Sequence, residues 1–192
     1  ELLERLSALV GSTFDRPIAA PDQVSEDYLI AKVERFDQAL DAGQLLERID
    51  IAPLLAGTTR PLSPSTQAEL LGHRFSYYAD DLAVITWDRA FLFEPHGDED
   101  VVDILEMANA QLVEMRGYND ALSSQIPRLD ALTRPSRARL RPFAGRHFAQ
   151  EARRLRALVA EMTELTERVD NALLVTEDVY LARVYSSAID LF

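Results

Sequence analysis

The spacing of hydrophobic residues changes at Asp100, and this change constrains the fold more than any other feature of the chain. From there, apolar positions recur alternately four and three residues apart for about four repeats, which is the heptad pattern of a helix that buries one narrow stripe. At about 1.5 Å per residue, such a helix is roughly 45–50 Å long. Pro127 should kink or end it. The residues of this first seam are Val101, Leu105, Ala108, Leu112, Met115, Asn119, Leu122, Ile126 and Leu129.

A second seam with similar spacing follows a break at Thr133 to Arg137. Two long helices joined by a short break form an antiparallel helical hairpin. We therefore expect residues 99–192 to form one long, coiled-coil-like hairpin. The residues of the second seam are Phe148, Leu155, Leu158, Met162, Leu165, Val169, Ala172, Thr176 and Val179.

Asn119 is the one polar residue of the first seam. A buried amide at such a position fixes the register or the number of helices, at some cost in stability. Alternatively, the seam turns toward solvent at this point. The spacing alone does not distinguish these two interpretations.

The first half of the chain carries the signals of short strands. Aromatic and β-branched residues form two runs around the polar pair Asp88–Arg89, which is typical of a β-hairpin with strands at residues 82–87 and 90–94. The run from Asp27 to Phe36 alternates in a similar way and is interpreted as a further strand. We therefore expect a small antiparallel β-sheet here.

Short helices accompany these strands. Ser63, followed by proline, predicts a capped helix that ends near Gly72, and Pro53 is expected to break a second helical stretch into two short turns. The predicted fold is therefore α+β. It has two domains: a small α+β domain at residues 1–98 and the long helical hairpin at residues 99–192.

Composition excludes several kinds of chemistry. The chain of 192 residues has no cysteine, so disulfides, thiolate nucleophiles and cysteine-ligated zinc are excluded. Its net charge of −12 argues against nucleic-acid binding by the whole surface. No apolar run approaches the roughly 18–20 residues that span a bilayer. The sequence also lacks the glycine-rich phosphate loops, the serine elbow and the histidine spacing of metalloenzymes, so no cofactor is expected.

One acidic stretch could offer metal ligands. In HGDED, residues 96–100, His96, Asp98 and Asp100 combine a nitrogen with two carboxylates. Acids before and in the first turn of a helix also satisfy its free N–H groups and its dipole, and we expect this capping role instead. Asp80 and Asp81 are expected to bound a strand. An enzyme with a cryptic acidic site near Asp80, Asp81 and His96 is the least supported function.

Arginine is concentrated between Arg128 and Arg156. Nine arginines stand there against two acids, so this block carries +7 and the rest of the chain −19. At the tip of a helical hairpin it could bind RNA or anionic lipid, or it could be a solvated face that pairs with acidic neighbours. The arginines proposed to contact a polyanion are Arg134, Arg137, Arg139, Arg141 and Arg146.

Several apolar residues are interpreted as an interface. Trp87 is expected to anchor either the core or an interface, because it is a large aromatic residue with a polar edge. Tyr180, Val184 and Ile189 continue an apolar face beyond the second seam, and exposed surface of this kind usually marks an interface. With Asn119, these residues predict a homo-oligomer, expected to be a dimer at micromolar concentration.

Three stretches resemble a group of uncharacterised bacterial proteins: HRFSYYADDLAVITWDRAFLFEP, DILEMANAQLVEMRGYNDAL and MTELTERVDNALLVTEDVYLARVY. In that group a cytosolic region precedes membrane-spanning segments, and the group is distantly similar to the family named for a requirement in meiotic nuclear division. The resemblance covers about residues 74–192 and carries no catalytic signature. It implies a region on the cytoplasmic face of a membrane, tethered by segments expected after Phe192.

Three functions are compatible with these observations. The favoured one is a non-enzymatic scaffold or interaction domain of a membrane-anchored protein, which binds itself or a protein partner through the helical hairpin. The second is an adaptor that binds RNA or anionic lipid through the arginine block, although nucleic acid is the less expected partner. The third is the cryptic acidic enzyme.

Overall fold

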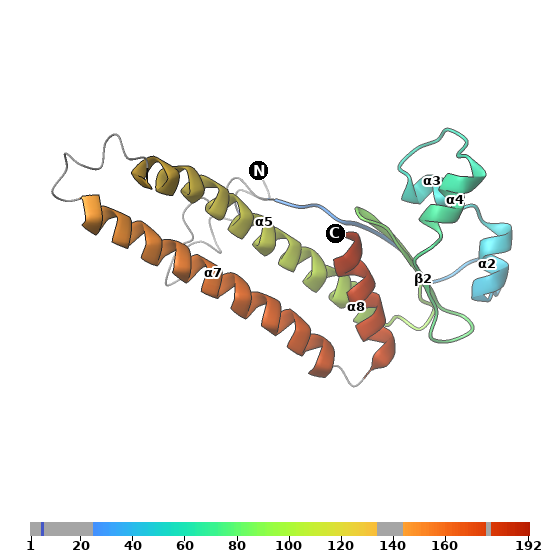
Figure 1. Ribbon diagram of the computed structural model, residues 1–192. Helices are drawn as coiled ribbons and strands as arrows, with labels where there is room; N and C mark the ends of the chain where they lie inside the picture. Colours follow the sequence, from blue (N-terminus) through green and yellow to red (C-terminus); the bar gives the residue numbers. More distant parts are fainter. Residues whose placement is uncertain (1–4, 6–24, 134–143, 176–177) are drawn as a thin grey trace.

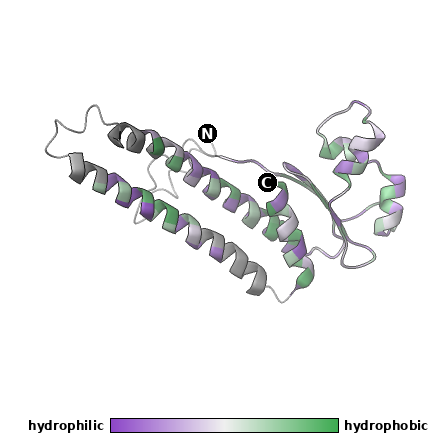
Figure 2. Ribbon diagram, viewed as in Figure 1, coloured by the Kyte–Doolittle hydropathy of each residue, from purple (hydrophilic) through white to green (hydrophobic). Residues whose placement is uncertain are grey.

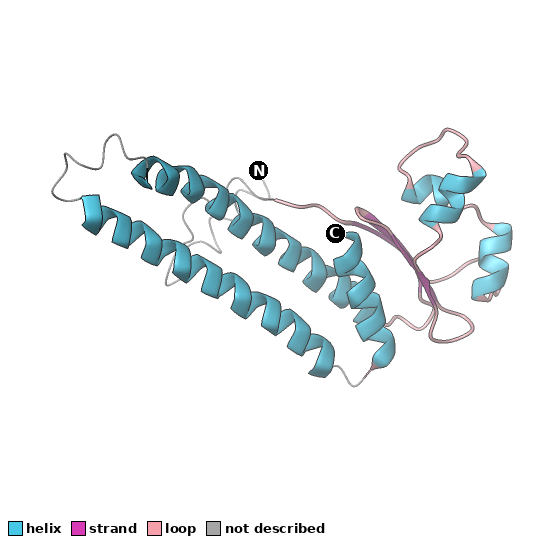
Figure 3. Ribbon diagram, in the orientation of Figure 1, coloured by secondary structure: helices cyan, strands magenta, loops and turns pink. Residues whose placement is uncertain are grey.

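The computed structural model describes residues 5, 25–133, 144–175 and 178–192. It confirms the α+β fold: a small four-stranded sheet with short helices is followed by long helices (Figures 1 and 3). The short helices lie on one side of the sheet, and the C-terminal helices lie on the other. Two of the long helices then extend away from the sheet, which gives the molecule a compact head and an elongated arm (Figure 1).

The sheet is mixed rather than purely antiparallel. Its strand order is β1-β4-β3-β2, with β1 at Leu29–Val33, β2 at Arg74–Phe75, β3 at Leu82–Ile85 and β4 at Arg89–Phe93. The expected β3–β4 hairpin and the expected strand β1 are confirmed, but β1 pairs with β4 in parallel. The alternation of apolar and polar residues along a strand indicates which of its faces is buried. It does not indicate whether the strand runs parallel or antiparallel to its neighbour. The prediction of an antiparallel sheet was therefore wrong at β1.

The hairpin turn lies one residue earlier than predicted. The backbone N–H of Thr86 donates to the carbonyl oxygen of Arg89 at 2.8 Å, so Trp87 and Asp88 form the turn instead of Asp88–Arg89. The buried Thr86 hydroxyl also donates to this carbonyl oxygen, at 2.9 Å. The hydroxyl of Tyr28 lies 2.9 Å and 2.8 Å from the carbonyl oxygens of Thr86 and Arg89, which fastens the start of β1 to the turn.

Three short helices precede the hairpin: α2 at Ala42–Arg48, α3 at Ala52–Leu55 and α4 at Pro64–Leu70. The predicted Ser63 cap of α4 is confirmed, because its hydroxyl accepts the N–H of Thr66 at 3.2 Å. Pro53 does not break the chain as predicted. It lies in the first turn of α3, where the missing N–H costs nothing, and the break falls earlier, at residues 49–51.

The two faces of the sheet bury two separate clusters. One cluster joins alternate residues of β3 and β4 to the short helices, and its members are Leu40, Leu45, Ile51, Leu55, Leu82, Val84, Phe91 and Phe93. The other joins the remaining strand residues to the C-terminal helices, and its members are Ala83, Ile85, Ala90, Leu92, Leu105, Ala108, Tyr185 and Ala188. The sheet is thus the middle layer between two layers of helices.

Three helices follow the sheet: α5 at Asp100–Thr133, α7 at Ala144–Val175 and α8 at Val179–Leu191. α5 and α7 run antiparallel side by side (Figure 1), as predicted for a helical hairpin. Pro127 lies inside α5 and does not end it. The second long helix does not continue to the end of the chain, because α8 starts anew with Asp178 as its N-cap.

α8 folds back onto the sheet instead of extending the arm. Val184 is 0% exposed, and Ile189 packs against the second cluster. The ring of Phe192 contacts the ring of Tyr28, with centroids 5.1 Å apart. The prediction that Val184 and Ile189 extend an exposed apolar face was therefore wrong, because the packing of α8 buries Val184 fully and covers part of Ile189.

No helix within the described ranges is both long enough and apolar enough to cross a membrane. The expected attachment to a membrane thus stays a prediction.

The packing of α5 against the sheet gives a matched test. Leu105→Ala should lower the free energy of unfolding by about 2–5 kcal/mol, because Leu105 is fully buried between the sheet and α8. Met107→Ala, two residues away on the exposed side of the same helix, should cost less than about 1 kcal/mol. Urea unfolding followed by circular dichroism measures both. Equal losses would contradict the proposed core.

Candidate functional site

The predicted polyanion site lies mostly outside the described residues. This holds for Arg134, Arg137, Arg139 and Arg141, whereas Arg146 belongs to α7 without a described side chain. Three further arginines of the block, Arg153, Arg154 and Arg156, are exposed on α7. A guanidinium nitrogen of Arg154 lies 3.4 Å from a carboxylate oxygen of Glu151. Binding of RNA or lipid by this block stays a prediction.

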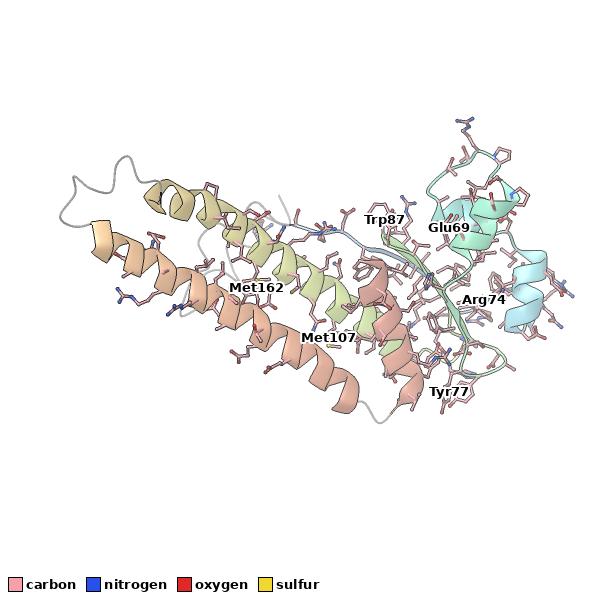
Figure 4. The ribbon with its side chains drawn as sticks, viewed as in Figure 1. Glu69, Arg74, Tyr77, Trp87, Met107 and Met162 are labelled. Carbon is pink, nitrogen blue, oxygen red and sulfur yellow. The ribbon has the colours of Figure 1, made fainter. Side chains whose placement is uncertain are left out.

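The predicted interface residues do not form one surface. Trp87 is 67% exposed at the hairpin turn, so it does not anchor the core (Figure 4). Asn119 is exposed on α5, which matches the interpretation that the seam turns toward solvent there. Val184 is buried, as described above. Tyr180 is half-buried at the start of α8, where its ring contacts that of Tyr77 with centroids 5.3 Å apart.

The acids and the histidine of the proposed cryptic site have separate tasks. His96 Nε2 lies 3.0 Å from a carboxylate oxygen of Asp80 in a half-exposed pair. Asp98 accepts the backbone N–H of Asp100 at 2.8 Å, which is the expected capping contact at the start of α5. Within the described residues, no group of three or more histidines and acids could hold a metal ion.

Asp81 organises the connection between β2 and β3. Its buried carboxylate accepts the backbone N–H groups of Tyr77 and Tyr78 at 2.9 and 2.8 Å, and it also lies 3.1 Å from the hydroxyl of Ser76. Acceptance of several N–H bonds by one carboxylate fixes a backbone firmly. The two tyrosines are thereby held at the end of the sheet, next to α8.

A cavity of about 220 Å³ lies beside these tyrosines, and we call it the tyrosine cavity. It forms where the start of β3, the end of β4, the start of α5 and the start of α8 meet. Gly97, with a φ of +80° that favours glycine, lies in the connection from β4 to α5. The polar and aromatic residues that line the cavity are Tyr77, Tyr78, Asp81, Phe93, Glu94, Asp98, Asp100, Asp178 and Tyr180.

The tyrosine cavity is negatively charged. Five of its lining residues are acids and none is Lys, Arg or His. The neighbouring Asp98, followed by burial and by Asp103 and Asp178, raises the pKa of Asp100. Burial raises the pKa of Tyr180 as well, and Asp81 and Glu94 add to this effect. The exposed Asp100 thus responds mainly to a neighbouring negative charge, whereas Tyr180 responds mainly to burial.

Sequence reasoning missed this cavity. Asp81 was interpreted as a strand boundary, Asp98 and Asp100 as caps, and Tyr180 as part of an interface. The cavity depends on α8 turning back, so that Asp178 and Tyr180 reach Tyr77 from about a hundred residues away. The one local signal was the adjacent pair Tyr77–Tyr78 beside acids, which alone does not indicate a site.

Comparison with known proteins gives one match. A family model described as "Uncharacterized protein MJ0711, N-terminal domain" matches residues 1–99. No curated protein and no solved structure matches the chain. The matched part ends where α5 begins, so it contains the sheet, the short helices and Asp81. The expected resemblance to the meiotic-division family stays a prediction.

The charge in the cavity can be tested by titration. The raised pKa of Asp100 means that the folded chain holds this proton more tightly than the unfolded chain does. The free energy of unfolding should therefore fall as the pH rises from the ordinary aspartate range through the Asp100 pKa. Asp98→Asn keeps an acceptor for the helix cap and removes the largest cause, so it should lower the Asp100 pKa.

Carbon-13 NMR of the carboxyl groups measures this pKa directly. Asp190→Asn is the matched control, because it removes the same charge from an exposed position of α8 that does not line the cavity. Identical Asp100 titrations in the wild type and in Asp98→Asn would show that Asp98 does not control this group.

Proposed function

The chain belongs to the family of the N-terminal domain of the uncharacterised protein MJ0711, whose description assigns no activity, and we propose that it is a non-enzymatic interaction domain that forms a homodimer through its helices. The dimer surface is the helical arm, which we define as α5 beyond Ala108 together with α7. The head, with its sheet between two layers of helices, serves as the rigid base of this arm.

The exposure of the first seam carries this proposal. Leu105 and Ala108 are fully buried where α5 crosses the sheet, but Met115 is 40% exposed and Ile126 is 58% exposed farther out. Beyond Ala108, no described side chain of α5 is buried. Hydrophobic residues nevertheless recur along both helices of the arm, among hydrophilic ones (Figure 2). The apolar stripe therefore continues along α5 beyond the sheet, where the single chain does not bury it fully.

The second helix of the arm repeats this pattern. Leu155, Leu158 and Met162 are half-buried, and Val159 beside them is 48% exposed. Two helices can cover each other's apolar stripe on one side only. A second pair of helices would complete a four-helix bundle and bury the rest.

The charges of α7 favour an antiparallel pairing of two copies. Residues 146–156 hold four arginines and one glutamate, whereas residues 161–170 hold three glutamates, one aspartate and one arginine. A two-fold axis near Val159 places the basic half of each α7 beside the acidic half of the other. Opposite charges at the rim of an interface select orientation and partner.

Substitution at the proposed axis should separate the two copies. Wild-type protein should sediment as a dimer at about 100 micromolar, whereas Val159→Glu should be a monomer, because two buried glutamates would face each other across the axis. The single chain already exposes Val159, so the variant should keep its fold. Analytical ultracentrifugation measures the mass, and circular dichroism checks the helix content.

Ala157→Glu is the matched control. Ala157 is also exposed, two residues away and on another side of α7, so this variant adds the same charge and should stay a dimer. A wild-type protein that is only monomeric at this concentration, or equal dissociation of both variants, would refute the proposed interface.

A further inference from the structure

Tyr77 of the tyrosine cavity contacts both Tyr78 and Tyr180 edge to face. The ring of Tyr77 contacts that of Tyr78 at 4.8 Å with an interplanar angle of 83°, and that of Tyr180 at 5.3 Å with an angle of 62°. Tyr77 and Tyr78 nevertheless stay 57% and 62% exposed. Rings set at such angles around a space can turn an electron-rich face toward it, and such faces attract organic cations.

Hydrogen bonds from backbone N–H groups to buried or capping carboxylates hold the three tyrosines in place. Asp81 holds the N–H groups of Tyr77 and Tyr78, and Asp178 holds the N–H of Tyr180 at 2.7 Å. The site is therefore largely formed before a ligand arrives, which lowers the entropy that binding would cost. Figure 4 shows Tyr77 at the end of the sheet, close to the start of α8.

The charge of the cavity exceeds what helix capping requires. Asp98, Asp100 and Asp178 stand at the starts of α5 and α8, where two helix dipoles contribute roughly +0.5 each. Asp81 and Glu94 add two more carboxylates that cap no helix. Among the described residues, none of these five acids is in an ion pair with Lys, Arg or His. Lys32 Nζ lies 2.9 Å from the backbone carbonyl oxygen of Asp98 but pairs with Glu99, which does not line the cavity. The negative charge of the five acids favours a cationic ligand.

The size of the cavity decides which kind of cation fits. No three of the described acids and histidines come close enough to hold a metal ion, so the carboxylates surround the space instead of converging on one point. The volume of about 220 Å³ corresponds to about seven water molecules at roughly 30 Å³ each. That space suits an alkylammonium or guanidinium group with its attached carbons.

We propose that the tyrosine cavity binds an organic cation, an alkylammonium or a guanidinium group, with Tyr77, Tyr78 and Tyr180 contacting it and the surrounding carboxylates balancing its charge. This binding site goes beyond the proposed dimer and does not depend on it. The cavity lies in the head, so the monomeric Val159→Glu variant should bind the same ligands.

The first experiment uses choline and agmatine as probes and follows the tyrosine ring signals by NMR. Both cations should give saturable shifts with a dissociation constant on the order of 1 mM. The uncharged analogue of choline, 3,3-dimethylbutan-1-ol, has the same shape and should give no saturable shift. Equal binding of the neutral analogue, or no saturable shift with either cation up to about 20 mM, would overturn the proposal.

Variants separate the two contributions to binding. Tyr77→Phe keeps the ring face and should bind choline within about twofold of the wild type, whereas Tyr77→Leu should weaken binding about three- to tenfold. The double variant Asp98→Asn, Asp178→Asn keeps both helix caps and should weaken binding roughly five- to tenfold. Glu106→Gln with Asp190→Asn removes the same charge elsewhere and should bind as the wild type does.

A last comparison identifies where the cation comes from. A short arginine-containing peptide that binds at least tenfold more tightly than agmatine would indicate that the cavity receives a side chain of a protein partner. Peptide and agmatine of equal affinity would indicate a small-molecule ligand. If the double variant in the cavity and its control pair bind choline equally, the carboxylates are helix caps only and the proposal is wrong.

Discussion

Every residue of β3 and four of the five residues of β4 are buried, so the central hairpin has no solvated face. A sheet in this state needs cover on both sides, because an uncovered face would expose a continuous apolar surface. One face receives α2, α3 and α4, and the other receives the start of α5 and the second half of α8. The direction of the chain after α7 follows from this need, since α8 supplies Tyr185 and Ala188 to that second face.

The return of α8 has a second consequence at the end of the sheet. It brings the N-terminus of α8 beside the N-terminus of α5 and beside the connection from β2 to β3. Free N–H groups at helix starts favour acids, and Asp98 and Asp178 satisfy this requirement. Because the two helix starts lie together, capping acids that are ordinary one by one become a concentrated negative charge. Three tyrosines share the same place, so the junction combines charge, aromatic surface and space.

The apolar residues of the arm have less cover than those of the head. In the head, the helices have a sheet face to cover, and residues such as Leu45, Leu55 and Leu105 are fully buried there. In the arm, α5 and α7 have only each other, and residues such as Ile126 and Val159 stay about half exposed. Two helices alone enclose little apolar volume, because each contacts its partner along one narrow stripe. A homodimer resolves this, and the opposite charges in the two halves of α7 support its antiparallel form.

The sequence alone determined the local structure, because local structure depends on spacing and on neighbouring residues. The seam from Val101 predicted α5, the aromatic runs around Asp88 predicted the hairpin, and Ser63 marked the start of α4. Only the tertiary structure decided the direction of β1 and the path of α8. The amphipathic pattern of residues 179–191 shows that one side will be buried, but not against which partner, so the arm and the sheet were equally consistent with it.

The tyrosine cavity, like the path of α8, was decided only by the tertiary structure. Asp81 and Asp178 each have a local explanation as a turn acid and a helix cap, and nothing near them in the sequence indicates that they share a space. Their approach depends on contacts between residues about a hundred positions apart, which follow from the burial of the sheet and not from local spacing. The sequence therefore supplied the groups of the site, and the packing of α8 on the hairpin brought them together.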